Sequence, residues 1–421
     1  MMKKTLFLLA TLCASLSLLA QPQMPPQIPP QVPPQMGPGA PGMPGMPPNP
    51  NAPKEARAFS GEVYVDQQST YTPDFKVDGS NAKVKNVILL IGDGMGVGAV
   101  NAAMYANGGM LTMTNLHTFG YVRTQSADNF TTDSAASGTA YATGQKTNNG
   151  YLGVNTEKER MANIPEKIAP LGFACGVVST DDLNGATPAA FFAHQAGRNA
   201  KDDIWSDLPG SKLVYASAGT QHVYETLPLG IQESIRREFT VVYNPTDPAA
   251  NGSDRLLYLP RTVGDDRGNY LPETTEMAID YLAAHSKKGF FLMVEGAHID
   301  HGAHANNTAQ TVKETLDFDK AVEVAIRFAE RDGHTLVIIS ADHETGATTL
   351  LRGNPEDGFV STGFASRGHS PMMVPLFAYG PRSKDFSCVQ ENSDVSNKIV
   401  AILTGQKTPV VSVPSKYIVN R

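Results

Sequence analysis

The sequence predicts an α/β domain with a mainly parallel central sheet and helices on both of its faces. The first observation is the apolar run Val87–Ile91, which enters Gly92-Asp93-Gly94 and is typical of a buried strand followed by a tight turn. The second is that further apolar runs alternate with helical patterns, as they do in βαβ units. The further strand-like runs are 174–179, 290–295, 335–340 and 374–379, and the helical patterns are 164–171, 187–194, 273–285 and 309–331.

The first twenty residues have the plan of a secretory signal peptide. Lys3 and Lys4 precede an apolar run that ends on small residues before Gln21. No other stretch approaches the ~20 apolar residues that a membrane span needs. We therefore expect export to the periplasm or the cell surface, or secretion, with no membrane span after cleavage. An uncleaved anchor is the alternative.

Residues 21–53 hold nearly half of the chain's 30 prolines and no charged residue. Neither collagen's glycine period nor a helix or strand pattern fits them, so they are predicted to be a disordered linker with extended polyproline II steps. Residues 54–421 are long enough for one large domain. Within that domain, 201–272 is the least regular part, where we expect loops, short strands and an extension of the sheet edge.

Charge and cysteine content exclude some classes of protein. The formal net charge is −7, with 41 acidic against 34 basic residues, and there is no basic tract, which disfavours nucleic-acid binding. Cys13 leaves with the signal peptide, so Cys175 and Cys388 could form at most one disulfide. Because Cys175 lies in a strand-like run, a buried free thiol is the alternative.

Polar residues gather where the predicted strands end. Asp93 follows the first strand, and Asp342 and His343 follow another. The segment Glu295–His304 holds three histidines and two carboxylates within ten residues. Each residue alone is more easily explained as an ordinary hydrogen-bonded side chain, but carboxylates and imidazoles brought together at strand ends are metal ligands by type. The pattern predicts a site for more than one metal ion.

A hydroxyl stands at the head of a run of small, helix-compatible residues, Thr132–Ala140. Ser134 would lie at a helix N-terminus, where free N–H groups and the helix dipole favour an oxyanion or a phosphate. Simple capping of the helix by Asp133 or Ser134 is the alternative. A divalent cation beside Ser134 would activate it as a nucleophile.

These residues belong to motifs through which the chain resembles the bacterial alkaline phosphatases. The motifs occur in the family's order and cover residues from about 85 to 200 and from 273 to 381, whereas 201–272 matches poorly. They are NVILLIGDGMG (Asn86 to Gly96), TDSAASGTA (Thr132 to Ala140), ATPAA (Ala186 to Ala190), Arg198, VEGAHIDHGAH (Val294 to His304), SADHETG (Ser340 to Gly346) and GHS (Gly368 to Ser370).

The resemblance implies an alkaline-phosphatase-like fold and a catalytic domain over 54–421. It implies hydrolysis of small phosphate monoesters through a phosphoserine at Ser134, with Arg198 gripping two phosphate oxygens as a planar fork. Two zinc ions and one magnesium ion are implied as cofactors. Their ligands would be Asp300, His304 and His369 for one zinc, Asp93, Asp342 and His343 for the other, and Asp93, Thr187 and Glu295 for magnesium.

The chain departs from the family's pattern at two positions beside the magnesium ligands. Gly185 stands where similar members commonly have Asp or His, and His301 stands where members vary among Lys, His and Trp. Asp133 is a further neighbour of the predicted site. We therefore expect activity to respond to added magnesium, and the identity of the third metal stays open.

The interval between His343 and His369 is too short for the large crown insertion that some members carry. The chain is therefore expected to lack a crown. The resemblance leaves a homodimer open.

Three other functions compete with a phosphomonoesterase. A sulfatase would need Cys or Ser in a Cys/Ser-x-Pro-x-Arg motif, and neither Pro nor Arg is present around Ser134. A phosphodiesterase would tend to lack an arginine such as Arg198, because a second ester would occupy the oxygens that it contacts. An inactive scaffold that binds a partner through its proline-rich segment is disfavoured because every expected ligand position is filled.

Overall fold

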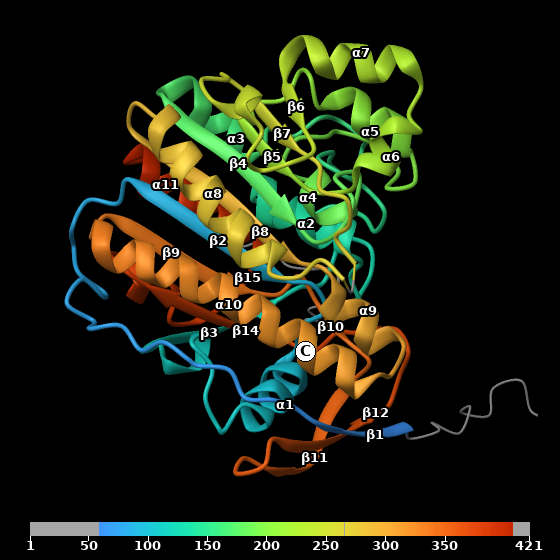
Figure 1. The fold of residues 1–421 in the computed structure, drawn as a ribbon, viewed down its shortest axis with the longest axis vertical. Helices are drawn as coiled ribbons and strands as arrows, with labels where there is room; N and C mark the ends of the chain where they lie inside the picture. Colours follow the sequence, from blue (N-terminus) through green and yellow to red (C-terminus); the bar gives the residue numbers. More distant parts are fainter. Residues whose placement is uncertain (1–58, 265, 407–421) are drawn as a thin grey trace, which may run out of the picture. The chain divides into compact units, whose positions relative to one another are not determined.

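The predicted apolar runs form the centre of a ten-stranded sheet in the computed structural model, which describes residues 59–264 and 266–406 (Figure 1). The predicted signal peptide (1–20) and the whole predicted proline-rich linker (21–53) lie outside the described residues. Across the sheet the strands are β15 (Val389–Glu391), β3 (Thr118–Arg123), β14 (Val374–Tyr379), β9 (Thr335–Ser340), β2 (Asn86–Gly92), β8 (Gly289–Gly296), β4 (Phe173–Ser179), β5 (Tyr215–Ser217), β7 (Leu256–Tyr258) and β6 (Thr240–Val242).

The sheet is mainly parallel, as predicted. Strand β14 runs antiparallel to both of its neighbours, β3 and β9, and every other neighbouring pair is parallel. Every residue of β2, β4, β8 and β9 is buried. Strands without an exposed face must be covered on both sides, which explains why their sequences are continuous apolar runs.

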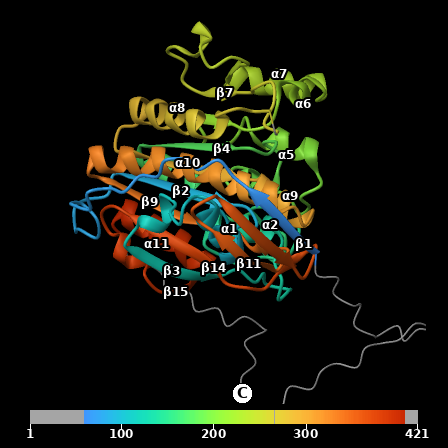
Figure 2. The ribbon, with the colours of Figure 1, turned by 60° about the horizontal axis from the view of Figure 1, so that its bottom comes forward.

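Helices cover both faces of the sheet (Figures 1 and 2). Helices α8 (Tyr270–His285) and α10 (Thr308–Asp332) pack against each other and against the central strands. Helix α11 (Asn392–Thr404) packs with α2 (Ser134–Thr143) and α3 (Ile164–Ile168) on the other side. Helix α10 buries one apolar stripe, begins at the Asn307 cap and ends at Gly333 in the left-handed conformation.

Two predicted helices are shorter than their sequence patterns. The pattern at 164–171 becomes α3 followed by a 3₁₀ turn, η2 (Ala169–Leu171), with Pro170 in that turn. The pattern at 187–194 becomes one short helix, α4 (Ala186–Ala189), which carries Pro188. A proline has no N–H to donate to the preceding turn and is tolerated only in the first turn of a helix. Each of these helices therefore stays short.

The region 201–272 extends the sheet through β5, β7 and β6, as expected, but it also contains helices that the sequence did not predict. These are α5 (Lys201–Asp207), α6 (Gln221–Glu225) and α7 (Leu229–Glu238), together with the 3₁₀ turn η3 (Pro248–Ala250). They are short and mostly exposed, so each offers too few apolar positions to establish a sustained pattern.

The segment between His343 and His369 forms small antiparallel sheets in place of a crown, in agreement with the prediction. Strands β11 (Thr348–Asn354) and β12 (Phe359–Phe364) join β1 (Phe59–Tyr64) beside α1 (Val97–Ala106). Strand β10 (Glu344–Thr345) pairs with β13 (His369–Ser370). The pairing of β13 with β10 brings His369 back to the carboxyl end of β9.

Cys175 is buried and Cys388 is exposed, and both thiols are free. Burial raises the pKa of the Cys175 thiol, which is the property of an inert core residue. None of the helices in the described part of the chain has the length and apolar character of a membrane span.

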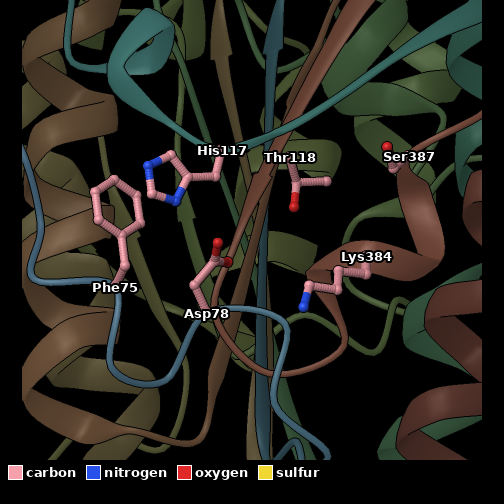
Figure 3. Close-up of a pocket in the computed structure, with 6 residues that line it drawn as sticks. All are labelled: Phe75, Asp78, His117, Thr118, Lys384 and Ser387. Carbon is pink, nitrogen blue, oxygen red and sulfur yellow. The ribbon is translucent and has the colours of Figure 1, made fainter. Parts of the chain in front are cut away.

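A surface pocket of about 490 Å³ lies at the amino-terminal end of the parallel strands (Figure 3). His117 precedes β3, and Lys384 lies in the 3₁₀ turn η4 (Ser383–Phe386) that follows the antiparallel strand β14. None of the residues predicted for the site lines this pocket; those that do are Phe75, Asp78, His117, Thr118, Lys384 and Ser387.

Candidate metal centre and active site

Three neighbouring strands place polar side chains at one edge of the sheet. Asp93 follows β2, Glu295 lies near the end of β8, and Asp342 follows β9. Since β8, β2 and β9 are adjacent and parallel, their carboxyl ends meet at the same edge. Gly94 allows the turn after β2 to pack closely against Asp300. Its φ of 71° is left-handed, and a Cβ at this position would lie 2.8 Å from the Asp300 Cα.

The first donor set consists of Asp300, His304 and His369, which each offer one ligand atom within 4.8 Å of the others. Asp300 and His304 lie one turn apart on α9 (His298–His304), with Asp300 Oδ2 3.2 Å from His304 Nε2. His369 arrives through the pairing of β13 with β10, and its Nε2 lies 3.2 Å from His304 Nε2.

Backbone carbonyls orient both imidazoles of this set. His304 Nδ1 lies 2.5 Å from the Arg367 carbonyl oxygen, and His369 Nδ1 lies 2.9 Å from that of Thr132. A carbonyl oxygen only accepts, so each Nδ1 must carry the proton. In the neutral imidazoles each Nε2 then has a lone pair directed toward the other ring and Asp300, as metal ligands require. Without a cation, the hydrogen bond with Asp300 raises the pKa of His304 to about 9.

The second donor set consists of Asp93, Asp342 and His343, again within 4.8 Å of one another and all buried. His343 Nε2 lies 3.1 Å from Asp342 Oδ2 and 3.5 Å from Asp93 Oδ1. These two carboxylate oxygens have no hydrogen-bond partner among the described residues. Buried, unsatisfied carboxylate oxygens around an imidazole fit a divalent cation, whose charge would compensate their burial.

The electrostatics of the second set also favour a bound cation. Burial, followed by the charges of Asp342, Asp300 and Glu295, raises the pKa of Asp93 well above its usual range. Burial raises the pKa of Asp342 to about 7. Burial also lowers the pKa of His343 well below its ordinary value, so this imidazole stays neutral with a free lone pair.

Ser134 is the first residue of α2, as the sequence indicated, and Asp133 caps that helix by accepting a hydrogen bond from Ala136 N at 2.9 Å. Ser134 Oγ lies 3.2 Å from His343 Nε2, at the edge of the second donor set. The other Asp133 oxygen accepts from Arg198 Nη1 at 3.1 Å. Asp133 therefore links Arg198 to the N-terminus of α2, where Ser134 lies.

Thr187 and Glu295 lie together at a third position. Thr187 is in α4, and its buried hydroxyl has no hydrogen-bond partner of ordinary geometry, although it is close enough to Glu295 to lower the pKa of that carboxyl. Burial, followed by the charge of Asp181, outweighs the effect of Thr187 and raises the pKa of the Glu295 carboxyl to about 8. Ser179 Oγ donates to the Glu295 carboxylate.

His301 does not join either donor set. It is exposed on α9, and its ring stacks on that of His298 with centroids 4.8 Å apart. Thr345 is a residue that sequence reasoning missed. Its Oγ1 donates to Asp300 Oδ1 at 2.5 Å and lies 3.2 Å from His343 Nδ1, so it contacts both sets. Its place in the motif SADHETG, two residues after His343, was the available signal.

Comparison with known proteins finds similar chains that share one description. The family model for alkaline phosphatase matches residues 84–226 and 262–362. Alkaline phosphatase 4 of Bacillus subtilis is 32% identical over 340 residues, which cover 75% of this chain and 74% of that protein. The alkaline phosphatase of Escherichia coli is 30% identical over 413 residues, which cover 77% and 87%.

A solved structure of the alkaline phosphatase from the Antarctic bacterium TAB5 is 33% identical and covers 76% of this chain and 98% of its own, with a TM-score of 0.70. Mutants of the TAB5 enzyme have been solved with magnesium bound in its M3 site. The sequence matches, the shared fold and the residues at the sheet edge lead to one conclusion: the chain belongs to the alkaline phosphatase family, a family of phosphomonoester hydrolases.

Proposed function

We propose that this protein is an exported phosphomonoesterase that uses Ser134 as its nucleophile. The observation that carries the proposal is the position of the Ser134 hydroxyl, at a helix N-terminus and 3.2 Å from a member of the second donor set. A phosphate at that place would meet free N–H groups of α2 and the guanidinium of Arg198. Both interactions compensate the charge of a phosphomonoester dianion.

Ser134 Oγ loses its proton and attacks phosphorus; an Oγ–P bond forms, the bond from phosphorus to the alcohol oxygen breaks, and that oxygen takes up a proton and leaves as the alcohol. Water then attacks the phosphoserine, the Oγ–P bond breaks, and Ser134 regains a proton as inorganic phosphate is released. Arg198, held by Asp133, fixes two phosphate oxygens and so aligns phosphorus with Ser134 in both steps. Monoesters are favoured over diesters because a monoester has three oxygens that carry no ester, enough for two at this arginine and one facing the donor sets, whereas a diester has only two.

The two donor sets would hold two zinc ions, and Thr187 and Glu295, with Asp93, would hold one magnesium ion. When bound, these cations supply positive charge to the attacking and leaving oxygens and favour the ionised form of the serine. The nitrogen-containing sets suit zinc, and the oxygen-only set suits magnesium.

The test of this function is the variant Ser134→Ala. We expect its turnover of a chromogenic aryl phosphate to fall by about 10³-fold or more, because the nucleophile is lost. Zinc content, measured by elemental analysis, should stay at the wild-type value. Ser206→Ala, at an exposed serine of α5, is the matched control and should keep wild-type turnover.

Two further measurements complete the test. Mass spectrometry of wild-type protein quenched in acid during turnover should find phosphate on the peptide that contains Ser134. Rates on bis-aryl phosphate and aryl sulfate should be far below the rate on aryl phosphate. Near wild-type activity of Ser134→Ala with full zinc loading would refute the proposal.

A further inference from the structure

The glycine at position 185 is not required by its backbone conformation. Gly185 caps α4 with φ −61° and ψ 153°, an extended conformation that any residue adopts. The restriction comes from space, because a Cβ at this position would lie 2.2 Å from Asp181 Oδ2 and 2.8 Å from the Asp182 carbonyl oxygen. The Asp181 carboxylate therefore occupies the volume that a side chain at 185 would fill.

Asp181 is fixed relative to Glu295 by hydrogen bonds in the turn after β4. Its N–H donates to Ser179 Oγ at 2.8 Å, and the Ser179 hydroxyl donates to the Glu295 carboxylate. Its Oδ1 accepts from Asp182 N at 2.7 Å, and its carbonyl oxygen accepts from Gly219 N at 2.7 Å. Its Oδ2 contacts the position of a Cβ on Gly185, so the carboxylate lies at the start of α4, the helix that contains Thr187.

An independent observation points to a ligand at this place. The Thr187 hydroxyl, 1% exposed, is buried without a hydrogen-bond partner of ordinary geometry next to Glu295, which is also 1% exposed. Ser179 Oγ accepts from Asp181 N and donates to the Glu295 carboxylate, so it joins the two acidic residues beside this unsatisfied hydroxyl. A cation between these oxygens would bind the lone pair of the hydroxyl oxygen and compensate the buried carboxylates.

We propose that Asp181 supplies a carboxylate to the oxygen shell of a magnesium ion held by Thr187 and Glu295, from the space that a side chain at 185 would otherwise fill. The inference rests on the proposed function, because it places Asp181 at the third cation position of that site. All of the donors are oxygen atoms, which favours a hard, partly hydrated cation such as Mg²⁺ over zinc. Asp181 thereby provides the contact that Gly185 cannot make.

The first experiment measures magnesium binding directly. Isothermal titration calorimetry of zinc-loaded protein with Mg²⁺ gives the affinity, and elemental analysis after gel filtration gives the magnesium and zinc contents. We expect Asp181→Asn, which keeps the shape and removes the charge, to weaken Mg²⁺ binding roughly 10- to 100-fold with zinc content unchanged. Asp182→Asn, at the neighbouring partly buried carboxylate, is the matched control and should bind Mg²⁺ like the wild type.

The second experiment moves the carboxylate. In the double variant Asp181→Ala with Gly185→Asp, a carboxylate enters the same volume from position 185, so Mg²⁺ affinity should recover relative to Asp181→Ala alone. Thermal unfolding of each variant, with and without Mg²⁺, shows that the protein is folded and reports binding without any assay of activity.

Wild-type Mg²⁺ affinity in Asp181→Asn, or a double variant that unfolds at the wild-type temperature and yet binds Mg²⁺ no better than Asp181→Ala, would overturn the inference. Absence of Mg²⁺ binding by the zinc-loaded wild type would overturn it as well. Failure of the proposed function gives a different result, because wild-type protein would then bind Mg²⁺ in an Asp181-dependent way and yet not hydrolyse aryl phosphate.

Discussion

Arg198 is held in place by one carboxylate that has two roles. Asp133 caps α2 through one oxygen and accepts hydrogen bonds from Gly150 N and Arg198 Nη1 through the other. Only one guanidinium nitrogen is used by this contact, and the side chain is about one third exposed. The remaining N–H groups of the fork are therefore free to meet a phosphate.

The variant Arg198→Lys tests this arrangement. Lysine keeps the charge but offers no planar fork, so one charged hydrogen bond to the phosphate is lost, a cost of about 1.5–3 kcal/mol. We expect kcat/KM for aryl phosphate to fall roughly 10- to 100-fold, with inhibition by inorganic phosphate weakened in parallel. Zinc content should not change. A variant with wild-type kcat/KM and wild-type inhibition would show that Arg198 makes no two-point contact.

The sequence predicted the positions of those site residues that directly follow a strand. Asp93, Asp342 and His343 follow apolar strands directly, so their position at the sheet edge could be predicted from type and spacing. His369 could not, because it reaches the site through the pairing of β10 with β13, and only the motif pointed to it. Asp181 was missed for a related reason: its carboxylate position depends on how the turn after β4 closes on Gly185.

At the scale of single elements, helix α3 shows how a short helix is stabilised by its first turn. Asn163 and Glu166 form a capping box, in which each side chain accepts a hydrogen bond from the other's backbone N–H. Glu166 Oε1 also contacts Arg160 and lies 3.2 Å from His194 Nε2. The carboxylate thereby links α3 to the segment that follows α4.

These contacts make Glu166 a pH-dependent source of stability. Burial alone would raise the pKa of Glu166, but hydrogen bonds from His194, Arg160 and the Asn163 backbone lower it to about 2, against an ordinary value of 4.5. A carboxyl group whose pKa is lower in the folded state stabilises that state above its unfolded pKa. The contribution is complete above pH 4.5 and is lost as the pH falls from 4.5 toward 2.

We expect Glu166→Gln to lower the free energy of unfolding at pH 7 by about 1–3 kcal/mol, since the side chain is only 14% exposed. The difference from the wild type should narrow as the pH falls below 4.5. Urea unfolding at several pH values between 7 and 3.5 measures it, with Glu276→Gln at an exposed position of α8 as the control. A difference that stays constant over this range would contradict the assignment.

The sequence indicated the long elements better than the short ones. The apolar stripe of α10 and the continuous apolar runs of β2, β4, β8 and β9 carry a strong signal, because they are buried along their whole length. Helix α7 is only ten residues long and buries only Gln232 and Ile235, so its amphipathic pattern is too short to stand out in the sequence. Such elements are set by tertiary contacts more than by local preference.

At the scale of the whole molecule, the parallel sheet brings the residues of the site together. The fold class of the protein follows from the alternating strand and helix patterns in its sequence. The order of the strands depends on non-local pairing, which the periodicity of the sequence does not reveal. Asp93, Glu295 and Asp342 come together because β8, β2 and β9 are neighbours, and the pairing of β10 with β13 adds His369. Both donor sets, and the carbonyl groups that orient the imidazoles of the first set, lie within the described residues.

We propose that the chain consists of a signal peptide (1–20) that is removed on export, a proline-rich spacer (21–53) and a catalytic domain (54–421). Deleting Pro22–Pro50 should therefore leave kcat on aryl phosphate and the thermal unfolding temperature unchanged, because all residues of both donor sets belong to the catalytic domain. A longer deletion through Tyr64 is the contrast, since it also removes β1, which pairs with β12 along six residues. That deletion should lower the unfolding temperature. A severalfold fall in kcat after the shorter deletion would show that the spacer contributes to catalysis.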